Sequence, residues 1–184
     1  MSLTKTPICN FGEKAKDFNL KSTDNKQLSL KDIKGENGTL VMFICNHCPY
    51  VKAIIKDLVN DIKSLERIGI KSAAIMSNDV KNYPEDSFEN MVSFSKSNNF
   101  PFPYLIDETQ DVAKKYGAVC TPDFFGYNKN LELQYRGRIR ELKDLKPVIV
   151  GDSDLKAAMK LIAETGNGPK NQIPSMGCNI KWFK

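Results

Sequence analysis

The sequence has little of what metal sites and membrane spans require. It holds a single histidine among 184 residues. No apolar run approaches the ~18 residues that a membrane helix needs. The net charge of +5 comes from lysines scattered along the chain, without a basic block interleaved with aromatic residues. These absences argue against a membrane span and give a nucleic-acid partner little support.

The N-terminal part of the sequence, residues 1–17, is polar and has no secretory signal pattern. The five cysteines are an odd number, and their spacings do not resemble a disulfide framework. We therefore expect a cytoplasmic protein in a reducing environment. There, a closely spaced cysteine pair is more often catalytic than structural.

The most informative stretch is an apolar run that ends at a Cys-x-x-Cys motif. Leu40–Ile44 is short and apolar on both faces, which predicts a buried central strand. Cys45 and Cys48 follow it directly, and a helix-spaced apolar pattern begins next. That pattern consists of Val51, Ile54, Ile55, Leu58, Val59, Ile62, Leu65 and Ile68. The two cysteines are therefore expected where a strand ends and a helix begins.

This position predicts an activated thiol. The first turn of a helix leaves backbone N–H groups unpaired, and these stabilise a thiolate. Cysteines in such motifs have pKa values of roughly 3.5–7.5, compared with about 8.5 for an ordinary thiol. His47 lies between the two cysteines. We expect its imidazolium to favour the Cys45 thiolate, which makes the disulfide a stronger oxidant.

A zinc site is the main alternative for such a motif. Zinc normally needs a second Cys-x-x-Cys or a histidine pair, and this chain has neither. Cys9, Cys120 or Cys178 would have to fold back to complete a metal site. The sequence therefore favours redox chemistry with no metal and no organic cofactor.

The remaining pattern predicts one α/β domain over residues 1–184, with a mixed central sheet flanked by helices. Residues 1–14 are expected to be irregular, and 167–184 to form a C-terminal tail. The expected elements are an N-terminal hairpin (17–20 and 27–30), a strand parallel to the first (70–76), a helix starting at 84–86, a brief strand (104–106), an inserted short helix ending at Gly117, a hairpin (123–127 and 131–136) and a last helix between Asp152 or Ser153 and Gly166.

Two motifs resemble the thioredoxin-fold superfamily. One is Cys45-Asn46-His47-Cys48 at the strand–helix junction, and the other is Thr121-Pro122 before the predicted hairpin. In that superfamily the proline is cis and lies against the cysteine pair. Within it, the chain resembles the peroxiredoxin-like branch with the AhpC/TSA-type domain. The segments that carry this likeness are 17–20, 83–88, 100–104, 116–125 and 177–182.

The resemblance implies a thiol–disulfide oxidoreductase with a role in cell redox homeostasis. Cys45 would attack a disulfide and Cys48 would resolve the mixed disulfide, so the pair must be accessible. Thr121 and Pro122 would present backbone groups to the substrate, and Cys120 is a possible accessory thiol within reach. The implied partners are thiol or disulfide protein substrates and a dithiol reductant protein.

The sequence departs from the peroxiredoxin pattern Pro-x-x-x-Thr/Ser-x-x-Cys. Counted back from Cys48, the two positions hold Val41 and Cys45. Counted back from Cys45, they hold Gly38 and Met42. A thiol-dependent peroxidase with an antioxidant role is therefore the alternative rather than the first prediction. A second alternative is a non-enzymatic metal-binding or docking module on the same fold.

Overall fold

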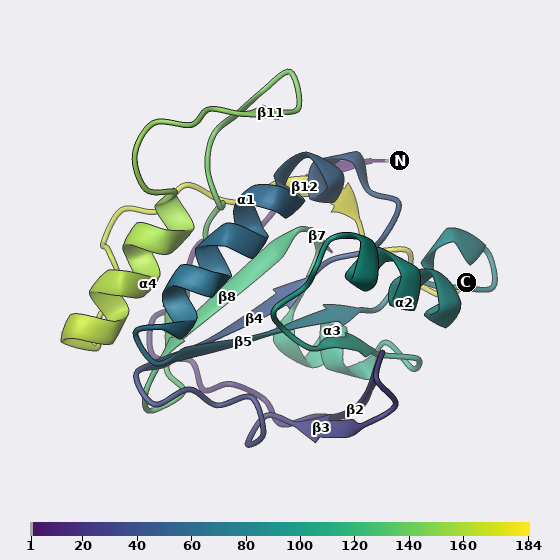
Figure 1. Ribbon diagram of the computed structural model, residues 1–184, viewed down its shortest axis with the longest axis horizontal. Helices are drawn as coiled ribbons and strands as arrows, with labels where there is room; N and C mark the ends of the chain where they lie inside the picture. The colour runs from purple at the N-terminus through teal and green to yellow at the C-terminus, as the bar shows by residue number, and fades with distance from the viewer. Residues whose placement is uncertain (1) are drawn as a thin grey trace.

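A seven-stranded mixed sheet runs through the middle of the protein (Figure 1). The computed structural model describes residues 2–184. Strands β4, β5 and β6 are parallel, and the other pairs in the sheet are antiparallel. In sheet order the strands are β3 (Gln27–Ser29), β2 (Asn19–Ser22), β6 (Tyr104–Ile106), β5 (Ile70–Met76), β4 (Gly38–Phe43), β8 (Asp123–Asn128) and β9 (Leu133–Tyr135). The prediction of a mixed central sheet with an N-terminal hairpin is confirmed.

Strand β4 lies inside the sheet, between β5 and β8. Every residue in it is therefore buried. Its side chains alternate between two apolar clusters, one on each face of the sheet. Leu40 and Met42 join the first cluster, and Val41 and Phe43 join the second. This two-sided burial explains the uninterrupted apolar run in the sequence.

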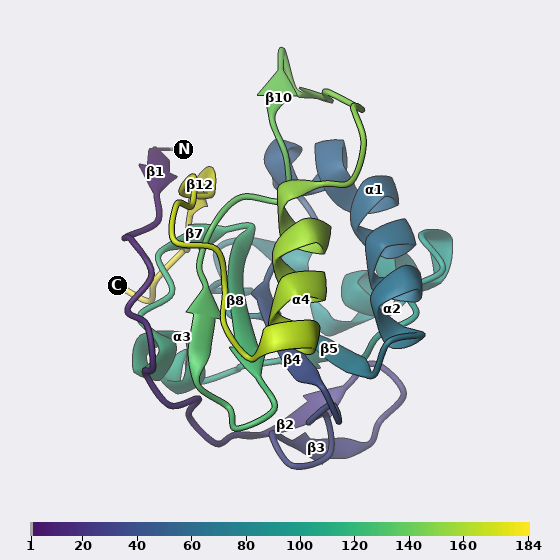
Figure 2. The same ribbon diagram turned by 90° about the vertical axis from the view of Figure 1, so that its left-hand side faces the viewer.

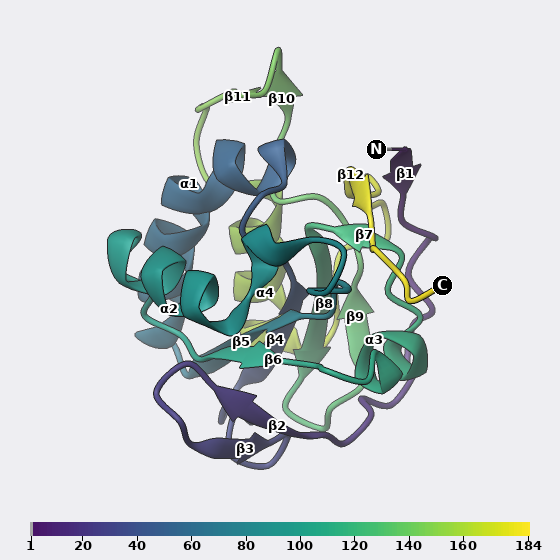
Figure 3. The same ribbon diagram turned by 90° about the vertical axis from the view of Figure 1, so that its right-hand side faces the viewer.

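Three helices cover one face of the sheet and one short helix covers the other (Figures 2 and 3). The first face carries α1 (Pro49–Glu66), α2 (Phe88–Ser97) and α4 (Asp154–Thr165). The second face carries α3 (Asp111–Tyr116), the predicted inserted helix. Ser153 caps α4 by accepting a hydrogen bond from the Lys156 N–H.

Helix α1 begins one residue after the cysteine motif, with Cys48 as its N-cap and Pro49 in its first turn. Proline suits this position because the first helical N–H groups have no intrahelical partner. The helix ends at Glu66, so Ile68 lies beyond it and is 38% exposed rather than inward-facing as predicted. The strand–helix junction thus holds both cysteines, as the sequence indicates.

The two chain ends form a second sheet, where the sequence predicts irregular tails. Strand β1 (Leu3–Lys5) pairs with β12 (Met176–Asn179), which also pairs with β7 (Cys120–Thr121). Figures 2 and 3 show these strands side by side. The expectation that residues 1–14 are irregular is therefore wrong for Leu3–Lys5, and the predicted C-terminal tail contains one strand, Met176–Asn179. Backbone pairing holds these strands, and it leaves no periodic pattern of apolar side chains.

A small hairpin of β10 (Leu142–Lys143) and β11 (Lys146–Pro147) projects beyond α1 (Figures 1 and 2). A 3-10 helix, η1 (Pro84–Asp86), precedes α2 near the cysteine motif. Within residues 2–184, no helix combines the length and the apolar character that a bilayer crossing needs.

Candidate active site

Cys45 and Cys48 lie together in the loop between β4 and α1, both as thiols. Both sulfurs contact Thr121, and each cysteine is the largest influence on the pKa of the other. Cys45 is 1% exposed and Cys48 is 0% exposed. Both sulfurs are therefore buried, and the expected accessibility of the pair is not found.

Cys48 lies at the centre of the group. Its Sγ is 3.2 Å from the Thr121 carbonyl oxygen and 3.1 Å from Cys178 Sγ. The pKa of Cys48 is lowered to about 4, chiefly because the Cys45 thiol donates to it. Burial opposes this shift, while the Cys178 thiol and the Val51 N–H in the first turn of α1 add to it. The helix N-terminus therefore stabilises negative charge on Cys48.

Cys45 behaves differently from the sequence-based expectation. Its pKa is raised well above the ordinary value because it shares its proton with Cys48, because it is buried and because the Asp86 carboxylate is close. The Thr121 hydroxyl, 3.5 Å from Cys45 Sγ, opposes this shift. The helix starts too late in the chain for its first N–H groups to act on Cys45.

His47 is paired with a buried carboxylate rather than with Cys45. Its Nδ1 is 2.7 Å from Asp86 Oδ2 and 4.0 Å from Cys45 Sγ. The hydrogen bond with Asp86 raises the pKa of His47. Burial alone would raise the pKa of Asp86, but hydrogen bonds from His47 and Asn78 lower it. The closer partner of His47 is therefore Asp86, and a direct effect of His47 on the Cys45 thiolate stays a prediction.

Asp86 also fixes the loop between the cysteines. Its Oδ1 accepts from the Asn46 N–H at 2.8 Å, and its Oδ2 accepts from Asn78 Nδ2 at 2.8 Å. The Asn46 side chain accepts from the Tyr104 hydroxyl at 2.8 Å. Sequence reasoning interpreted Asp86 only as a helix start. One signal in the sequence was Asn78, which follows β5. Because the ends of the parallel strands β4 and β5 meet at one edge of the sheet, Asn78 is expected near the cysteine motif, and there it binds Asp86.

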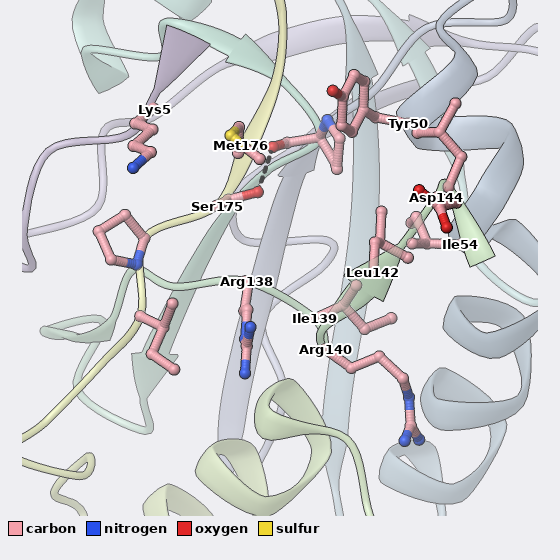
Figure 4. A pocket seen from close by; sticks show the side chains of 14 residues that line it. Lys5, Tyr50, Ile54, Arg138, Ile139, Arg140, Leu142, Asp144, Ser175 and Met176 are labelled. Atoms are coloured by element: carbon pink, nitrogen blue, oxygen red, sulfur yellow. Dashed lines mark hydrogen bonds between the residues drawn. The ribbon is translucent and has the colours of Figure 1, made fainter. Parts of the chain in front are cut away.

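Thr121 and Pro122 contact the cysteine pair from the opposite side. The Thr121–Pro122 bond is cis, as the resemblance implies. Thr121 contacts Cys45 through its hydroxyl and Cys48 through its carbonyl oxygen. The Pro122 carbonyl accepts from Ser175 Oγ at 2.7 Å (Figure 4). The backbone carbonyl oxygens of Thr121 and Pro122 thus both have partners within the protein.

The thiol nearest to Cys48 from outside the motif is Cys178 rather than the expected Cys120. Cys120 is buried in β7, and its Sγ donates to the Pro122 carbonyl at 3.6 Å. Burial raises the pKa of Cys120 well above its ordinary value. Cys178, which the sequence suggests is a packed tail residue, is in direct contact with Cys48.

A mostly apolar pocket of about 440 Å³ opens beside Pro122, between α1 and the segment after β9 (Figure 4). Tyr50 and Ile54 of α1 line one side, but neither cysteine lines it. Two arginines at its edge have ion-pair partners, Arg138 with Asp154 at 2.7 Å and Arg140 with Asp57 at 2.5 Å. The lining also includes Lys5, Ile139, Leu142, Asp144, Leu145, Ile173, Pro174, Ser175 and Met176.

One group in residues 2–184 has its ligand atoms close enough to hold a metal ion. Single atoms of Cys45, His47 and Asp86 all lie within 4.8 Å of one another. However, His47 Nδ1 and Asp86 Oδ2 are already hydrogen-bonded to each other. The Asp86 carboxylate also accepts hydrogen bonds from Asn46 and Asn78. Metal binding would have to break these contacts.

Comparisons with known proteins give the chain a family. The model of the AhpC/TSA family matches residues 11–142. The crystal structure of an uncharacterized conserved protein from Geobacillus kaustophilus is 39% identical with a TM-score of 0.93, and the match covers 100% of this chain and 97% of that one. A hypothetical protein from Sinorhizobium meliloti 1021 is 35% identical with a TM-score of 0.90, covering 99% of both chains. No curated protein matches the chain.

A more distant structure places the fold more broadly. The thiol:disulfide interchange protein, a thioredoxin family protein from Chlorobium tepidum TLS, is 20% identical with a TM-score of 0.60. The match covers 83% of this chain and 94% of that chain. At this identity the likeness concerns the fold, which is thioredoxin-like as predicted. Since the family model covers most of the chain, including the Cys45–Cys48 pair, the protein is a member of the AhpC/TSA family with a redox role.

Proposed function

We propose that the protein is a thiol–disulfide oxidoreductase whose redox centre is Cys45-Asn46-His47-Cys48. The observation that carries this proposal is that the sulfurs of Cys45 and Cys48 both contact Thr121, whose bond to Pro122 is cis. The pKa of Cys48 is lowered to about 4, chiefly through Cys45. A stabilised reduced pair makes the corresponding disulfide a good oxidant. The pocket at Pro122 lies beside the contacts with Thr121.

The first chemical step uses the shared proton of the pair. Cys45 Sγ attacks one sulfur of a substrate disulfide, and its proton passes to the Cys48 thiolate. A Cys45–substrate disulfide forms, the substrate S–S bond breaks and one substrate sulfur leaves as a thiolate. The released thiolate then takes the proton from Cys48. These steps conserve both protons and electrons.

The second step is intramolecular. The Cys48 thiolate attacks Cys45 Sγ, which forms the Cys45–Cys48 disulfide and expels the second substrate thiolate. The effective concentration of Cys48 is high because it lies three residues from Cys45 and contacts the same residue, Thr121. The reverse sequence oxidises a substrate dithiol.

Substrate access requires a local opening, because Cys45 is 1% exposed. The half-buried His47 ring stacks on Tyr83 with centroids 5.9 Å apart beside the cysteine. We assign His47 to positioning: through Asp86 it orders the loop that an incoming substrate must displace. Thr121 and Pro122 face the substrate on the other side.

The partners follow from the chemistry. We propose thiol or disulfide proteins as substrates and a dithiol protein as the reductant, with no metal or organic cofactor in the reaction. A cytoplasmic location and a role in redox homeostasis fit a pair that functions as a dithiol. Thiol trapping in intact cells, followed by fractionation, tests this: the pair should be mainly reduced in the cytoplasmic fraction.

The decisive experiment tests the reduced protein with two substrates in turn, a model protein disulfide and hydrogen peroxide. We expect reduction of a model protein disulfide by the wild type and its loss in Cys45→Ser. The variant Cys48→Ala should accumulate a mixed disulfide at Cys45. Failure of the wild type to reduce protein disulfides, or trapping at a different cysteine, would refute the proposal.

Peroxide provides the competing substrate, because the peroxiredoxin-like proteins that the chain resembles reduce peroxides by way of a sulfenic acid. We expect slow, non-saturating loss of thiol when hydrogen peroxide is mixed rapidly with the reduced protein. Fast and saturating oxidation at micromolar peroxide, without disulfide reduction, would favour the peroxidase instead.

A further inference from the structure

The C-terminal strand holds a third thiol against the redox pair. Cys178 Sγ lies 3.1 Å from Cys48 Sγ. Strand β12 places Cys178 directly opposite Thr121 of β7. The preceding residue, Gly177, makes this approach possible, since a Cβ there would lie 1.9 Å from the Thr121 carbonyl oxygen. Only glycine therefore fits at this crossing.

Cys48 is the sulfur that links the redox pair to Cys178. It is the cysteine of the motif whose Sγ contacts Cys178 Sγ, and Cys45 has the largest influence on its pKa. At 3.1 Å, Cys178 Sγ is close enough to attack Cys48 Sγ once Cys48 is part of a disulfide.

We propose that Cys178 is a third redox-active thiol, which attacks Cys48 in the oxidised protein and moves the disulfide from Cys45–Cys48 to Cys48–Cys178. The Cys178–Cys48 bond forms, the Cys45–Cys48 bond breaks and Cys45 leaves as a thiolate that takes up the proton released by Cys178. The step is an isomerisation and needs no further oxidant. It rests on the proposed function, which supplies the Cys45–Cys48 disulfide.

The charges around Cys178 favour this step only after the pair is oxidised. In the reduced protein its pKa is raised to about 12 by burial and by Cys48, while Lys181 opposes the shift. Once Cys48 is part of a disulfide, it carries no negative charge and accepts no proton from Cys178. The contribution of Cys48 to the raised pKa then disappears, and Cys178 ionises more readily.

Exchange also changes which sulfur is available to a substrate. In the Cys48–Cys178 form, Cys45 is a thiol again and its resolving partner is occupied. A substrate joined to Cys45 in that form has no neighbouring Cys48 thiolate to expel it. The isomerisation would therefore convert a rapidly released mixed disulfide into a long-lived one.

Peptide mapping tests the proposal directly. The reduced wild type is oxidised with one equivalent of oxidised glutathione, quenched with acid, alkylated and cut with trypsin. Cleavage after lysine places Cys45 and Cys48 in one peptide (35–52) and Cys178 in another (171–181). We expect two products: a disulfide within peptide 35–52, and a cross-link from Cys48 to Cys178 with Cys45 alkylated.

Two serine variants provide the comparison. Cys178→Ser should lose the cross-link and the alkylation of Cys45 in oxidised protein, while keeping the Cys45–Cys48 disulfide. Cys120→Ser, which changes the other buried cysteine of this sheet, should give the wild-type pattern. In Cys45→Ser, glutathione joined to Cys48 should be displaced by Cys178, which gives the cross-link without Cys45. This variant keeps the test informative if Cys178→Ser does not fold.

The outcomes separate the two proposals. A Cys45–Cys48 disulfide without any cross-link between 35–52 and 171–181 overturns the role of Cys178 and leaves the proposed function intact. A cross-link that joins Cys45 rather than Cys48 to Cys178 also overturns it. If the wild type forms neither disulfide, the proposed function and this inference fail together.

Discussion

Two buried cysteines near the Thr121–Pro122 segment have pKa values that are shifted in opposite directions. Cys48, at the β4–α1 junction, has a pKa lowered to about 4, whereas the pKa of Cys120, in β7, is raised. Both residues are 0% exposed. Burial is therefore shared, and the difference comes from hydrogen-bond donors. Both sulfurs contact a carbonyl oxygen, that of Thr121 for Cys48 and that of Pro122 for Cys120. Cys48 has in addition Cys45, Cys178 and the first turn of α1, which lower its pKa.

This difference shows that a reactive thiol in this fold is made by its neighbours rather than by its exposure. The donors to Cys48 come from three segments far apart in the sequence, namely the motif loop, helix α1 and the C-terminal strand β12. Removing these donors one at a time should move Cys48 toward the behaviour of Cys120.

The largest difference in activity is expected between two single variants, Cys48→Ser and Cys120→Ser. Cys48→Ser should lower the rate of protein-disulfide reduction by roughly 10²-fold or more, because the intramolecular second step is lost. Cys120→Ser, which keeps a donor for the Pro122 carbonyl, should leave the rate unchanged. Steady-state assays of both variants check this, and equal losses in the two would remove the distinction between them.

The next effect concerns the strand that brings Cys178 to the pair. In Gly177→Ala the added Cβ would meet the Thr121 carbonyl oxygen at 1.9 Å, so β12 has to shift. We expect a loss of about 1–3 kcal/mol in the free energy of unfolding and a higher pKa for Cys48. Urea unfolding measures the first, with Met176→Ala at an exposed position of the same strand as the control. Wild-type stability would show that β12 does not depend on this close approach.

Asp86→Asn tests the carboxylate on the Cys45 side of the pair. Without Asp86, His47 loses its partner and its pKa should fall, while the Nδ1 proton becomes available to Cys45. The pKa of Cys45 should then fall, because the Asp86 carboxylate is one of the groups that raise it. NMR titration of His47, the only histidine, and the ultraviolet absorbance of thiolates report the two changes. A pKa of His47 that does not move would contradict the pairing.

The same ion pair predicts how stability depends on pH. The folded-state pKa of His47 is raised, so its contribution is fully present below about pH 6.5, the ordinary value. It is lost as pH rises through the raised pKa. The stability difference between wild type and Asp86→Asn should therefore shrink with rising pH, and a constant difference from acid to alkaline pH would be inconsistent with a charged pair.

The smallest effect separates the hydrogen bond of Cys178 from its redox chemistry. Cys178→Ala removes a donor to Cys48 and should raise the pKa of Cys48 by about one unit. Cys178→Ser keeps a hydroxyl donor and should change this pKa less. Thiolate absorbance against pH measures both variants. Equal shifts in the two would mean that packing rather than hydrogen bonding sets the effect.

The sequence predicts the parts of this fold that depend on apolar periodicity and local capping. Strands β5 and β6 have the predicted bounds, and Ser153 and Gly166 frame α4 as their residue types indicate. Strands β1 and β12 were missed because their pairing is made by backbone groups, and such short segments carry no periodic signal.

The candidate site was predicted where it is local and missed where it is not. The Cys-x-x-Cys motif and the Thr121–Pro122 pair are visible as short patterns. Asp86 and Cys178 reach the site only through tertiary structure, across 40 residues in the contact of Asp86 with Asn46 and 130 residues in that of Cys178 with Cys48. They also reverse the expected charge pattern, since Asp86 neutralises His47 and Cys178 stabilises Cys48.

The most direct measurement is the equilibrium of the protein with glutathione buffers of graded redox potential, with the disulfides mapped at each point. The account predicts one two-electron couple that includes Cys45–Cys48. Its potential should be less negative than the about −270 mV of thioredoxin, whose thiol pKa is about 7, because the Cys48 thiolate is more strongly stabilised. Absence of a Cys45–Cys48 disulfide at every potential, or a potential more negative than that of thioredoxin, would contradict it.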